Sequence, residues 1–495
     1  MNRLALSLIA HLAGGHLHGE DTTVDAVSND TRALRSGSLY VALRGERFDG
    51  HDFVAAAAQA GAAALLVEHP VQSELPQVIV ADAQLALARL AAGLQRDRSG
   101  KVVAITGSNG KTSVKMLVSA ILQRAGQTYS SPGNRNNEIG LPLAVIEAPD
   151  QAEFAVYEMG AGKPGDIAYL TRIARPDVAL VNNVAAAHLE RLGSLLGVAQ
   201  TKGAIYSALP ADGVAVINAD DAFGEYFAAL VPGRRALRFG LETSAEVSAR
   251  AVMTDAQGSR FTLVSPDGEA PVALALPGRH NVRNALAAAA IALGCGVPLA
   301  VIAEGLAAAR PVAGRLLAHR LDRGALLIDD SYNANPGSLD AAIATLAAAS
   351  RQGWLVLGDM RELGPEAAAL HAAAGARARQ AGIARLYALG PLSAHAAHAF
   401  GEGARVFDSH AALAQALQHD LEEIATGEPG PGTREKQAQT LSAAPAQAAV
   451  AGPGSQVPGP VLLIKGSRGS AMDRIVSALL PAAPAHSSGG TAHAA

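Results

Sequence analysis

A glycine-rich turn that ends in Lys-Thr carries the clearest chemical meaning in this sequence. The apolar, β-branched run Val102–Thr106 leads into Gly107-Ser108-Asn109-Gly110-Lys111-Thr112-Ser113. Glycines let successive backbone N–H groups point at one anion, Lys111 adds a cation, and the Thr112 hydroxyl can reach a phosphate-bound Mg²⁺. The segment therefore predicts a loop that binds the phosphates of a nucleoside triphosphate.

The match to the full phosphate-loop pattern is incomplete. That pattern has a glycine six residues before the lysine, where this sequence has Ile105. An ordinary glycine turn that caps a helix is the alternative. The surroundings favour the phosphate loop, because the preceding run fits a buried parallel strand and residues 114–122 carry apolar side chains at helical spacing.

Two further apolar runs deliver polar side chains to what would be the same sheet edge. Glu158 follows the run 154–157, and His188 follows the run 178–184. A carboxylate there can serve as an oxygen ligand for Mg²⁺. A surface glutamate and a structural histidine are the alternatives. Lys202, inside an apolar helical segment, is most simply a solvated helix lysine.

Three other polar groups are candidates for ligand contacts. Asn281 and Asn284 are three residues apart and share a helix face, where their amides could bind a base or cap the backbone. Arg315 follows a domain junction and could reach a phosphate. Two carboxylates and two amides crowd the segment 329–336 directly after the apolar run 326–328, which indicates a ligand loop.

Composition limits the class of protein. The chain has 495 residues, 49% of them hydrophobic, and a formal net charge of −4, so we expect neither a nucleic-acid partner nor membrane insertion. Cys295 is the only cysteine, which excludes an intrachain disulfide and fits a reducing compartment. The first residues of the chain are apolar, but histidines interrupt them. We therefore expect a helix that ends at Gly14-Gly15 rather than a signal sequence.

Alternating strand-like and helical runs predict an α/β fold with three domains. A small α/β domain spans residues 1–97, a central domain with a mostly parallel sheet spans 98–313, and a doubly wound Rossmann-like domain spans 314–495. Within the last domain, residues 426–460 are rich in Gly, Pro, Ala, Gln and Ser and predict a disordered insertion. The tail after Pro481 is expected to be equally loose.

Taken in order along the chain, the motifs resemble the Mur ligase family, the ATP-dependent amide-forming enzymes that build the peptide stem of the bacterial cell wall. The resemblance rests on Ser28–Arg32, Asp49–Phe53, Gly133–Pro142, Asp329–Pro336, Leu357–Gly364 and Lys465–Gly469, together with the phosphate loop. The segments 133–142 and 329–336 look most like the member that adds D-alanyl-D-alanine.

The resemblance implies a role for each candidate residue. Residues 107–113 would hold the ATP phosphates, Asn281 would lie near the adenine, Arg315 near the γ-phosphate, and Asp330 near the ribose. Thr112, Glu158, His188 and a carbamylated Lys202 would bind Mg²⁺, and the catalytic set would be Lys111, Lys202, His188 and Arg315. The substrate-binding set would be Ser28, Asn29, Asp30, Thr31, Arg32, Asn134, Asn136, Asn137, Asn333 and Asn335.

The implied reaction is ATP-dependent ligation through an acyl phosphate. The partners would be UDP-N-acetylmuramoyl-tripeptide and D-alanyl-D-alanine, and the chain would act as a cytoplasmic monomer in peptidoglycan precursor synthesis, and so in cell shape and division. Two other enzymes share this chemistry: the sister ligase that adds the third stem residue, and folylpolyglutamate synthetase. A phosphate-loop module that binds nucleotide without turnover is an alternative of a different class.

Overall fold

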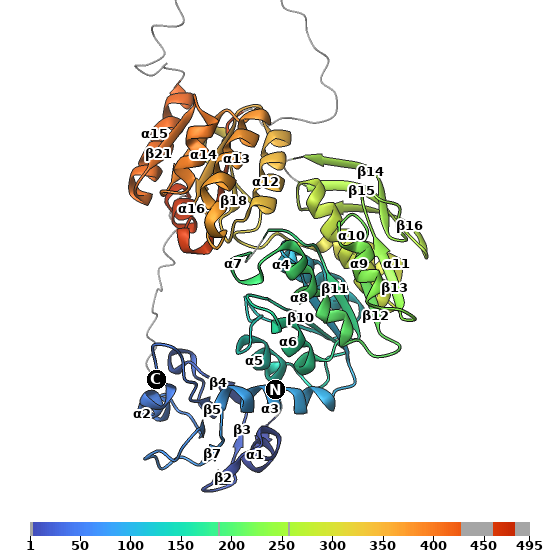
Figure 1. Ribbon diagram of the computed structural model, residues 1–495, viewed down its shortest axis with the longest axis vertical. Coiled ribbons are helices and arrows are strands. Elements are labelled where there is room, and N and C mark those ends of the chain that lie inside the picture. Colours follow the sequence, from blue (N-terminus) through green and yellow to red (C-terminus); the bar gives the residue numbers. More distant parts are fainter. Residues whose placement is uncertain (1–2, 187–188, 256–257, 427–458, 481–495) are drawn as a thin grey trace, which may run out of the picture. The chain divides into compact units, whose positions relative to one another are not determined.

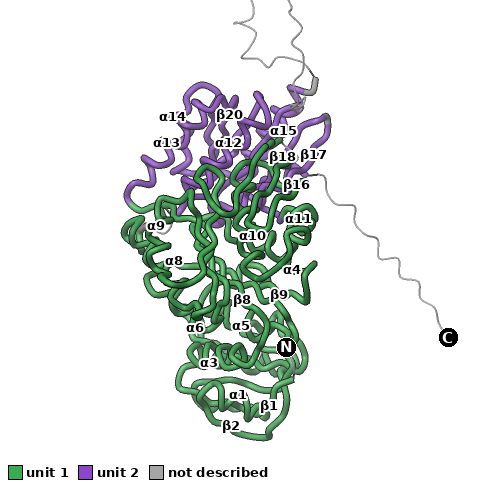
Figure 2. Tube along the Cα trace, turned by 90° about the vertical axis from the view of Figure 1, so that its right-hand side faces the viewer, with its two compact units in different colours: residues 1–311, 362–364 green, residues 312–361, 365–495 purple. Residues whose placement is uncertain are grey.

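Short, mostly apolar strands of three to six residues, separated by alanine-rich helices, pair into three main sheets. The computed structural model describes residues 3–186, 189–255, 258–426 and 459–480. The chain divides into two compact units, one of residues 1–311 with 362–364 and one of residues 312–361 with 365–495, which are coloured separately in Figure 2.

The first sheet lies in the N-terminal part of the first unit. Its strand order is β2-β7-β6-β5-β4, and only β2 runs antiparallel to its neighbour. The strands are β2 (His16–His18), β4 (Ala26–Ser28), β5 (Ser38–Val41), β6 (Ala64–Val67) and β7 (Gln77–Ile79). The other elements are β1 (Leu4–Ala5), β3 (Thr23–Val24), α1 (Leu6–Ala13), η1 (Thr31–Ala33), η2 (Gly50–Phe53), α2 (Val54–Gln59) and α3 (Ala83–Arg96). As predicted, α1 ends at Gly14, which adopts a left-handed conformation.

The central sheet has six parallel strands in the order β13-β12-β11-β8-β10-β9. They are β8 (Lys101–Thr106), β9 (Thr128–Ser130), β10 (Phe154–Glu158), β11 (Val178–Val181), β12 (Val214–Asn218) and β13 (Arg235–Phe239). The helices are α4 (Lys111–Ala125), α5 (Gly140–Glu147), α6 (Asp166–Ala174), α7 (Leu189–Leu192), α8 (Leu195–Ser207), α9 (Gly224–Ala229), α10 (Arg279–Gly294) and α11 (Leu299–Ala308).

Alternation along β8 shows how both faces of this sheet are buried. Val102 and Ala104 join the apolar cluster that contains α5, α6 and α8, whereas Val103 and Ile105 join the cluster that contains α4, α10 and α11. Helices therefore cover both faces, as a parallel sheet requires (Figure 1). This arrangement leaves the carboxyl ends of the strands as the place for a ligand.

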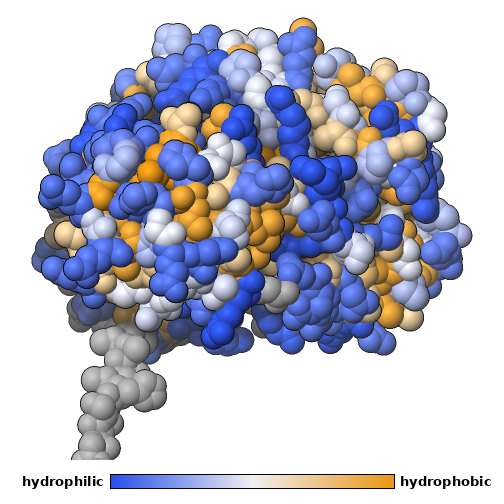
Figure 3. Space-filling model, turned by 90° about the horizontal axis from the view of Figure 1, so that it is seen from below, coloured by the Kyte–Doolittle hydropathy of each residue, from blue (hydrophilic) through white to orange (hydrophobic). Residues whose placement is uncertain are grey.

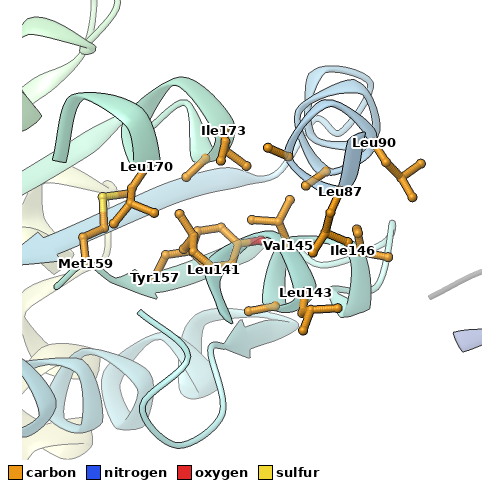
Figure 4. Close-up of a cluster of buried hydrophobic side chains, with 14 of the residues drawn as sticks. Leu87, Leu90, Leu141, Leu143, Val145, Ile146, Tyr157, Met159, Leu170 and Ile173 are labelled. Atoms are coloured by element: carbon orange, nitrogen blue, oxygen red, sulfur yellow. The ribbon is translucent and has the colours of Figure 1, made fainter. Parts of the chain in front are cut away.

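Helix α3 of the N-terminal part packs on the central part. Leu87 and Leu90 of α3 lie against side chains of α5, such as Val145 and Ile146, in one apolar cluster (Figure 4). Leu170 and Ile173 of α6 and Tyr157 of β10 extend that cluster, so the two parts share one core.

A three-stranded antiparallel sheet, which the sequence did not predict, accompanies the parallel central sheet. It consists of β14 (Ser248–Asp255), β15 (Gly258–Ser265) and β16 (Gly268–Leu274), within the region for which the sequence predicted a mostly parallel sheet. On β15, buried Phe261 and Leu263 alternate with more exposed residues, and both belong to the core beneath α10 and α11. One face of this sheet therefore packs on that core, and the other face is more exposed.

The second unit is built on a six-stranded sheet in the order β17-β18-β22-β19-β20-β21, with only β17 antiparallel. The strands are β17 (Leu317–Arg320), β18 (Leu326–Asp330), β19 (Gly353–Gly358), β20 (Arg385–Leu389), β21 (Ala404–Phe407) and β22 (Val461–Lys465). The helices are α12 (Pro336–Ala349), α13 (Ala367–Gln380), α14 (Ser393–Phe400), α15 (His410–Thr426) and α16 (Asp473–Leu479), and short 3-10 turns are η3 (Asp322–Gly324), η4 (Gly364–Glu366) and η6 (Arg468–Ser470).

The α/β class with three sheet-based parts is confirmed, and the apolar runs near residues 102, 154, 178 and 326 are all strands. The boundaries 1–97, 98–313 and 314–495 stay predictions. The expected insertion falls almost entirely on residues 427–458, and the expected tail on residues 481–495, and both stretches lie outside the described residues.

Apolar surface lies in separate areas among hydrophilic residues on the face drawn in Figure 3. Among the described helices, none combines the length and the apolar character that crossing a bilayer demands.

Candidate active site

The predicted phosphate loop connects β8 to α4 at the carboxyl edge of the central sheet. Gly110 is left-handed and ends the loop, so α4 begins at Lys111. A Cβ on Gly110 would lie 2.6 Å from Asn182 Nδ2 and 2.7 Å from Asn284 Oδ1, so both conformation and space require glycine here. Lys111 Nζ donates to Gly107 O at 2.8 Å, which places the ammonium over the loop.

The segment after β11 holds the phosphate loop in shape. Ser108 N donates to Asn183 O, Asn109 N donates to Asn183 Oδ1, and Ser108 Oγ donates to Ala185 O. Asn182 Nδ2 donates to Asn109 O. Since neighbouring parallel strands supply both segments, the loop is anchored on rigid elements.

Glu158, at the end of β10, is 3% exposed and carries a negative charge next to the loop. Thr112 Oγ1 donates to its Oε2 at 3.0 Å, and Asn136 Nδ2 donates to its Oε1 at 2.8 Å. Burial raises the pKa of this carboxyl. The positive charges of Lys111 and Lys115 and its hydrogen bonds lower the pKa by more than burial raises it, so the pKa lies below the usual glutamate value. A buried, ionised carboxylate beside a threonine hydroxyl offers the hard oxygen ligands that Mg²⁺ prefers.

Lys202 is a buried lysine on α8, not the solvated one that its sequence context suggested. Only 2% of Lys202 is exposed to solvent. Burial, with a smaller contribution from the charge of Lys111, lowers the pKa of its amine from 10.5 to about 7. A substantial share of this amine is therefore uncharged at neutral pH, which makes it nucleophilic.

We expect Lys202→Met to stabilise the first unit in carbonate-free buffer at pH 7, by roughly 2–4 kcal/mol, because a buried ammonium is costly. The pKa is about 7 in the fold and 10.5 in the unfolded chain. Between these values the unfolded chain binds more protons, so the stability of the wild-type protein rises with pH across this window. Urea denaturation at about pH 7 and about pH 9.5 measures the slope, which the Met variant should lose. Equal slopes in the two proteins would contradict a depressed pKa.

A chain of amides connects the predicted adenine contact to the phosphate loop. Asn281 Nδ2 donates to Pro277 O, Asn284 Nδ2 donates to Asn281 Oδ1, and Asn182 Nδ2 donates to Asn284 Oδ1. Asn281 is 2% exposed, and these hydrogen bonds fix the orientation of its amide. Asn182 Oδ1 is buried and has no hydrogen-bond partner among the described residues.

The segment Ser28–Arg32 lies at the carboxyl end of β4 in the N-terminal sheet. Asp30 caps the short helix η1, accepting from Arg32 N, and forms a bidentate ion pair with the Arg32 guanidinium. Hydrogen bonds from Arg32 lower the pKa of Asp30 to about 2. The Arg32 side chain is 88% exposed, so its guanidinium, paired with Asp30, is accessible from solvent at this sheet edge.

In the second unit, two arginines share one aromatic ring. The Arg315 guanidinium carbon lies 4.1 Å from the centroid of Tyr332, and that of Arg468 lies 5.2 Å from the same centroid. Such contacts hold a guanidinium by attraction to the ring face. The carboxyl edge of this sheet therefore carries two cations gathered on Tyr332.

The two predicted carboxylates are the last residues of β18 rather than part of the following loop. Asp329 accepts from Gly314 N and from the Ser331 backbone and hydroxyl. Asp330 forms a buried ion pair with Lys465 at 2.5 Å. Burial raises the pKa of Asp330 although the Lys465 charge opposes this. Asp330 is thus a group with a fixed partner, and its proposed contact with ribose stays a prediction.

Three of the six asparagines predicted to bind substrate have structural hydrogen bonds, and Asn29 is exposed directly after the end of β4. Asn136 donates to Glu158, Asn137 Oδ1 accepts from Gly140 N at the start of α5, and Asn335 caps α12 in a reciprocal pair with Ser338. Asn134 and Asn333 are exposed.

His188, predicted as a second metal ligand, lies outside the described residues. Over the rest of the chain that the structure describes, no group of three or more His, Cys, Asp and Glu could hold a metal ion. The metal candidates that do lie together are Thr112 and Glu158.

Lys115 and Tyr332 also lie beside these sites, although the motifs of the sequence predict no role for either residue. Lys115 lies one helical turn after Lys111, a spacing that places both on one face of α4 and could have revealed it. The contacts of Tyr332 with two arginines depend on three separate loops, and nothing in the sequence signals them.

Models of known families match all three parts of the chain. A model described as Mur ligase family, catalytic domain matches residues 23–99, one described as Mur ligase middle domain matches residues 105–292, and one described as Mur ligase, glutamate ligase domain matches residues 314–428.

Similar proteins agree with these models. A ligase of Escherichia coli (strain K12) named UDP-N-acetylmuramoyl-tripeptide--D-alanyl-D-alanine ligase is 44% identical over 83% of this chain and 92% of its own length. A crystal structure of MurF from Acinetobacter baumannii has a TM-score of 0.85 and 30% identity, and covers 97% of this chain and 99% of its own. A MurF ligase from Thermotoga maritima in complex with ADP has a TM-score of 0.76 and 27% identity, covering 92% of this chain and 97% of its own. On these matches, which span the phosphate loop, the buried carboxylate and both flanking domains, the chain belongs to the Mur ligase family.

Proposed function

We propose that this protein is an ATP-dependent ligase that joins D-alanyl-D-alanine to the stem peptide of UDP-N-acetylmuramoyl-tripeptide, in peptidoglycan precursor synthesis. The observation that carries the proposal is the phosphate loop beside a buried, ionised carboxylate, in a chain 44% identical to a ligase with that name. Neither the sister ligase that adds the third residue nor folylpolyglutamate synthetase gains support from this similarity.

The chemistry requires an activated carboxylate, because a free carboxylate would have to expel oxide to react with an amine. Transfer of the γ-phosphoryl group to the terminal carboxylate of the tripeptide gives an acyl phosphate and ADP. The uncharged amine of D-alanyl-D-alanine then attacks the carbonyl carbon, and phosphate leaves as the amide forms. Negative charge accumulates on the transferred group, so cations aimed at it, Lys111 among them, lower the barrier.

The residues around the loop fit a bound Mg²⁺. Both oxygens of Glu158 already face donors, Thr112 and Asn136, so the carboxylate is oriented before a ligand arrives. When bound, the ion would neutralise phosphate charge and polarise the γ-phosphoryl group. Thr112 and Glu158 would hold one ion, and His188 a second.

A carbamylated Lys202 would add an anionic group at this edge. Its amine is buried, has a pKa of about 7, and lies near enough to Lys111 for the two charges to interact. An uncharged amine adds to carbon dioxide, with loss of one proton, and the resulting carbamate relieves the repulsion from Lys111. The modified side chain then serves as an oxygen ligand rather than a buried cation.

The other domains supply the remaining substrates in this proposal. The exposed Arg32 at the carboxyl edge of the N-terminal sheet would bind the diphosphate of the uridine nucleotide. Arg315 would meet the γ-phosphate, Asp330 the ribose, and Asn281 the adenine. The domain boundaries would be 1–97, 98–313 and 314–495, and the enzyme would act as a cytoplasmic monomer.

We expect Tyr332→Leu to lower kcat/KM for ATP by roughly 3- to 30-fold, because the ring no longer holds Arg315 and Arg468, a contact of about 0.5–2 kcal/mol. Tyr332→Phe keeps the ring and should remain within about twofold of wild type. Steady-state kinetics with varied ATP measure both. If the Leu and Phe variants behaved alike, the ring would not position the arginines.

One assay tests the reaction and its substrates together. The protein is incubated with ATP, Mg²⁺, UDP-N-acetylmuramoyl-tripeptide and D-alanyl-D-alanine, and the products are identified by mass. We expect one D-alanyl-D-alanine added per tripeptide, with one ADP and one phosphate released. Phosphate release that responds to a diamino acid or to glutamate, but not to D-alanyl-D-alanine, would overturn the proposal.

A further inference from the structure

Lys115 is a buried lysine that lies next to the reacting groups without belonging to the phosphate loop. Its side chain is 9% exposed, although lysines are rarely buried without a partner. It stands on α4 one turn beyond Lys111, and α4 is packed between β10 and α10. The fold therefore holds its ammonium in one place.

The partners of Lys115 lie on the segment after β9. Nζ donates to Ser131 O at 2.9 Å and to Gly133 O at 2.9 Å. These two carbonyls open the segment 131–137, which contains the asparagines expected to contact the peptide substrate. Lys115 thus ties this segment to the helix that begins at the phosphate loop.

The same ammonium lies 3.5 Å from Glu158 Oε2. Glu158 is tied to the same segment from the other side, since Asn136 donates to its Oε1 and Asn136 O accepts from Gly160 N. One cation and one amide therefore fix the carboxylate and the segment together. Neither contact requires the N-terminal sheet or the second unit.

We propose that Lys115 is a positioning residue that fastens the 131–137 segment to the phosphate-loop helix and to Glu158, so that the peptide substrate meets a segment already in place. The proposal rests on the proposed function only for the identity of that substrate. Lys115 has no role in moving protons or phosphoryl groups, and it acts through the backbone of residues 131–133 and through the Glu158 carboxylate.

Hydrogen exchange on the free protein tests the structural half of the proposal. In Lys115→Met, amides of residues 131–137 should exchange about tenfold faster, because two hydrogen bonds from a charged donor are lost. Amides of β11 and β12 should keep their rates. Lys115→Arg retains a charged donor and should restore most of the protection, and Lys101→Met, which removes an exposed lysine at the far end of β8, should change nothing. If exchange rose evenly over the central sheet, or not at all in 131–137, the proposal would be wrong.

Kinetics test the functional half. We expect Lys115→Met to raise KM for the uridine-linked tripeptide about tenfold while KM for ATP changes by less than about twofold, a split that general loss of folded protein would not produce. If the Met variant does not fold, Lys115→Gln keeps a neutral donor and should show the same split. A fall in kcat alone, with both KM values unchanged, contradicts the proposal. Absence of turnover by wild type on these substrates would count against the proposed function instead, and the exchange result would still decide the role of Lys115.

Discussion

Lys111→Ala should lower kcat/KM for ligation by about a thousandfold, because it removes the cation fixed over the phosphate loop. Nζ is held by Gly107 O, so its charge is placed before the nucleotide binds and needs no reorganisation as negative charge develops on the γ-phosphoryl group. Phosphate release in the presence of all substrates measures the effect. The loss should fall mainly on kcat, since negative charge shifts onto the leaving phosphate oxygen in the transition state, where Lys111 stabilises it more than in bound ATP.

The same variant should also shift two neighbouring groups. Lys111 lowers the pKa of both Glu158 and Lys202, so its removal should raise both. Lys101→Ala is the matched control, because Lys101 is an exposed lysine at the opposite end of β8. Product formation by Lys111→Ala at the rate of that control would show that the phosphate loop is wrongly assigned.

The parts of the fold that could be predicted are those in which the residue types of a short segment already favour the structure that the segment adopts. At β8 and α4, a β-branched run, a glycine turn and a helical pattern follow one another without ambiguity, and the structure has each of them there. The sheet of β14, β15 and β16 was missed because β14 is a run of small and charged residues that buries little. The sheet buries one face against α10 and α11, and this tertiary packing is not visible in the local pattern of β14.

Some residues of the candidate site could likewise be predicted from local sequence, and others could not. Residue type and strand-end position led to Glu158, and its hydrogen bonds with Thr112 and Asn136 give that position a physical basis. The sequence predicts a solvated Lys202, whereas its burial depends on how α8 packs on the sheet. For Asn137 and Asn335 the sequence suggests a ligand contact, whereas in the structure their side chains accept hydrogen bonds at the start of a helix. An amide side chain suits either role, so its type alone does not distinguish them.

Glu158→Gln should lower kcat by roughly 100- to 1,000-fold and raise the Mg²⁺ concentration that gives half-maximal rate by more than about tenfold. The replacement has the same shape, and its carbonyl oxygen can still accept from Asn136, so the melting temperature should change little. Its neutral amide, however, is a poor ligand for a divalent cation. Glu304→Gln is the matched control, because Glu304 is an exposed carboxylate on α11.

The pH dependence of the wild-type enzyme separates a metal-binding carboxylate from one that serves as an acid or base. The pKa of Glu158 lies below the usual glutamate value because Lys111 and Lys115 outweigh its burial, so the group stays ionised through neutral pH and down to its lowered pKa. A proton donor or acceptor would instead need a pKa near the working pH. We therefore expect no limb from Glu158 in the rate profile above about pH 5. A limb near neutral pH that disappears in Glu158→Gln would instead assign proton transfer to this carboxylate. It would contradict the view that Lys111 and Lys115 keep Glu158 ionised for a metal ion.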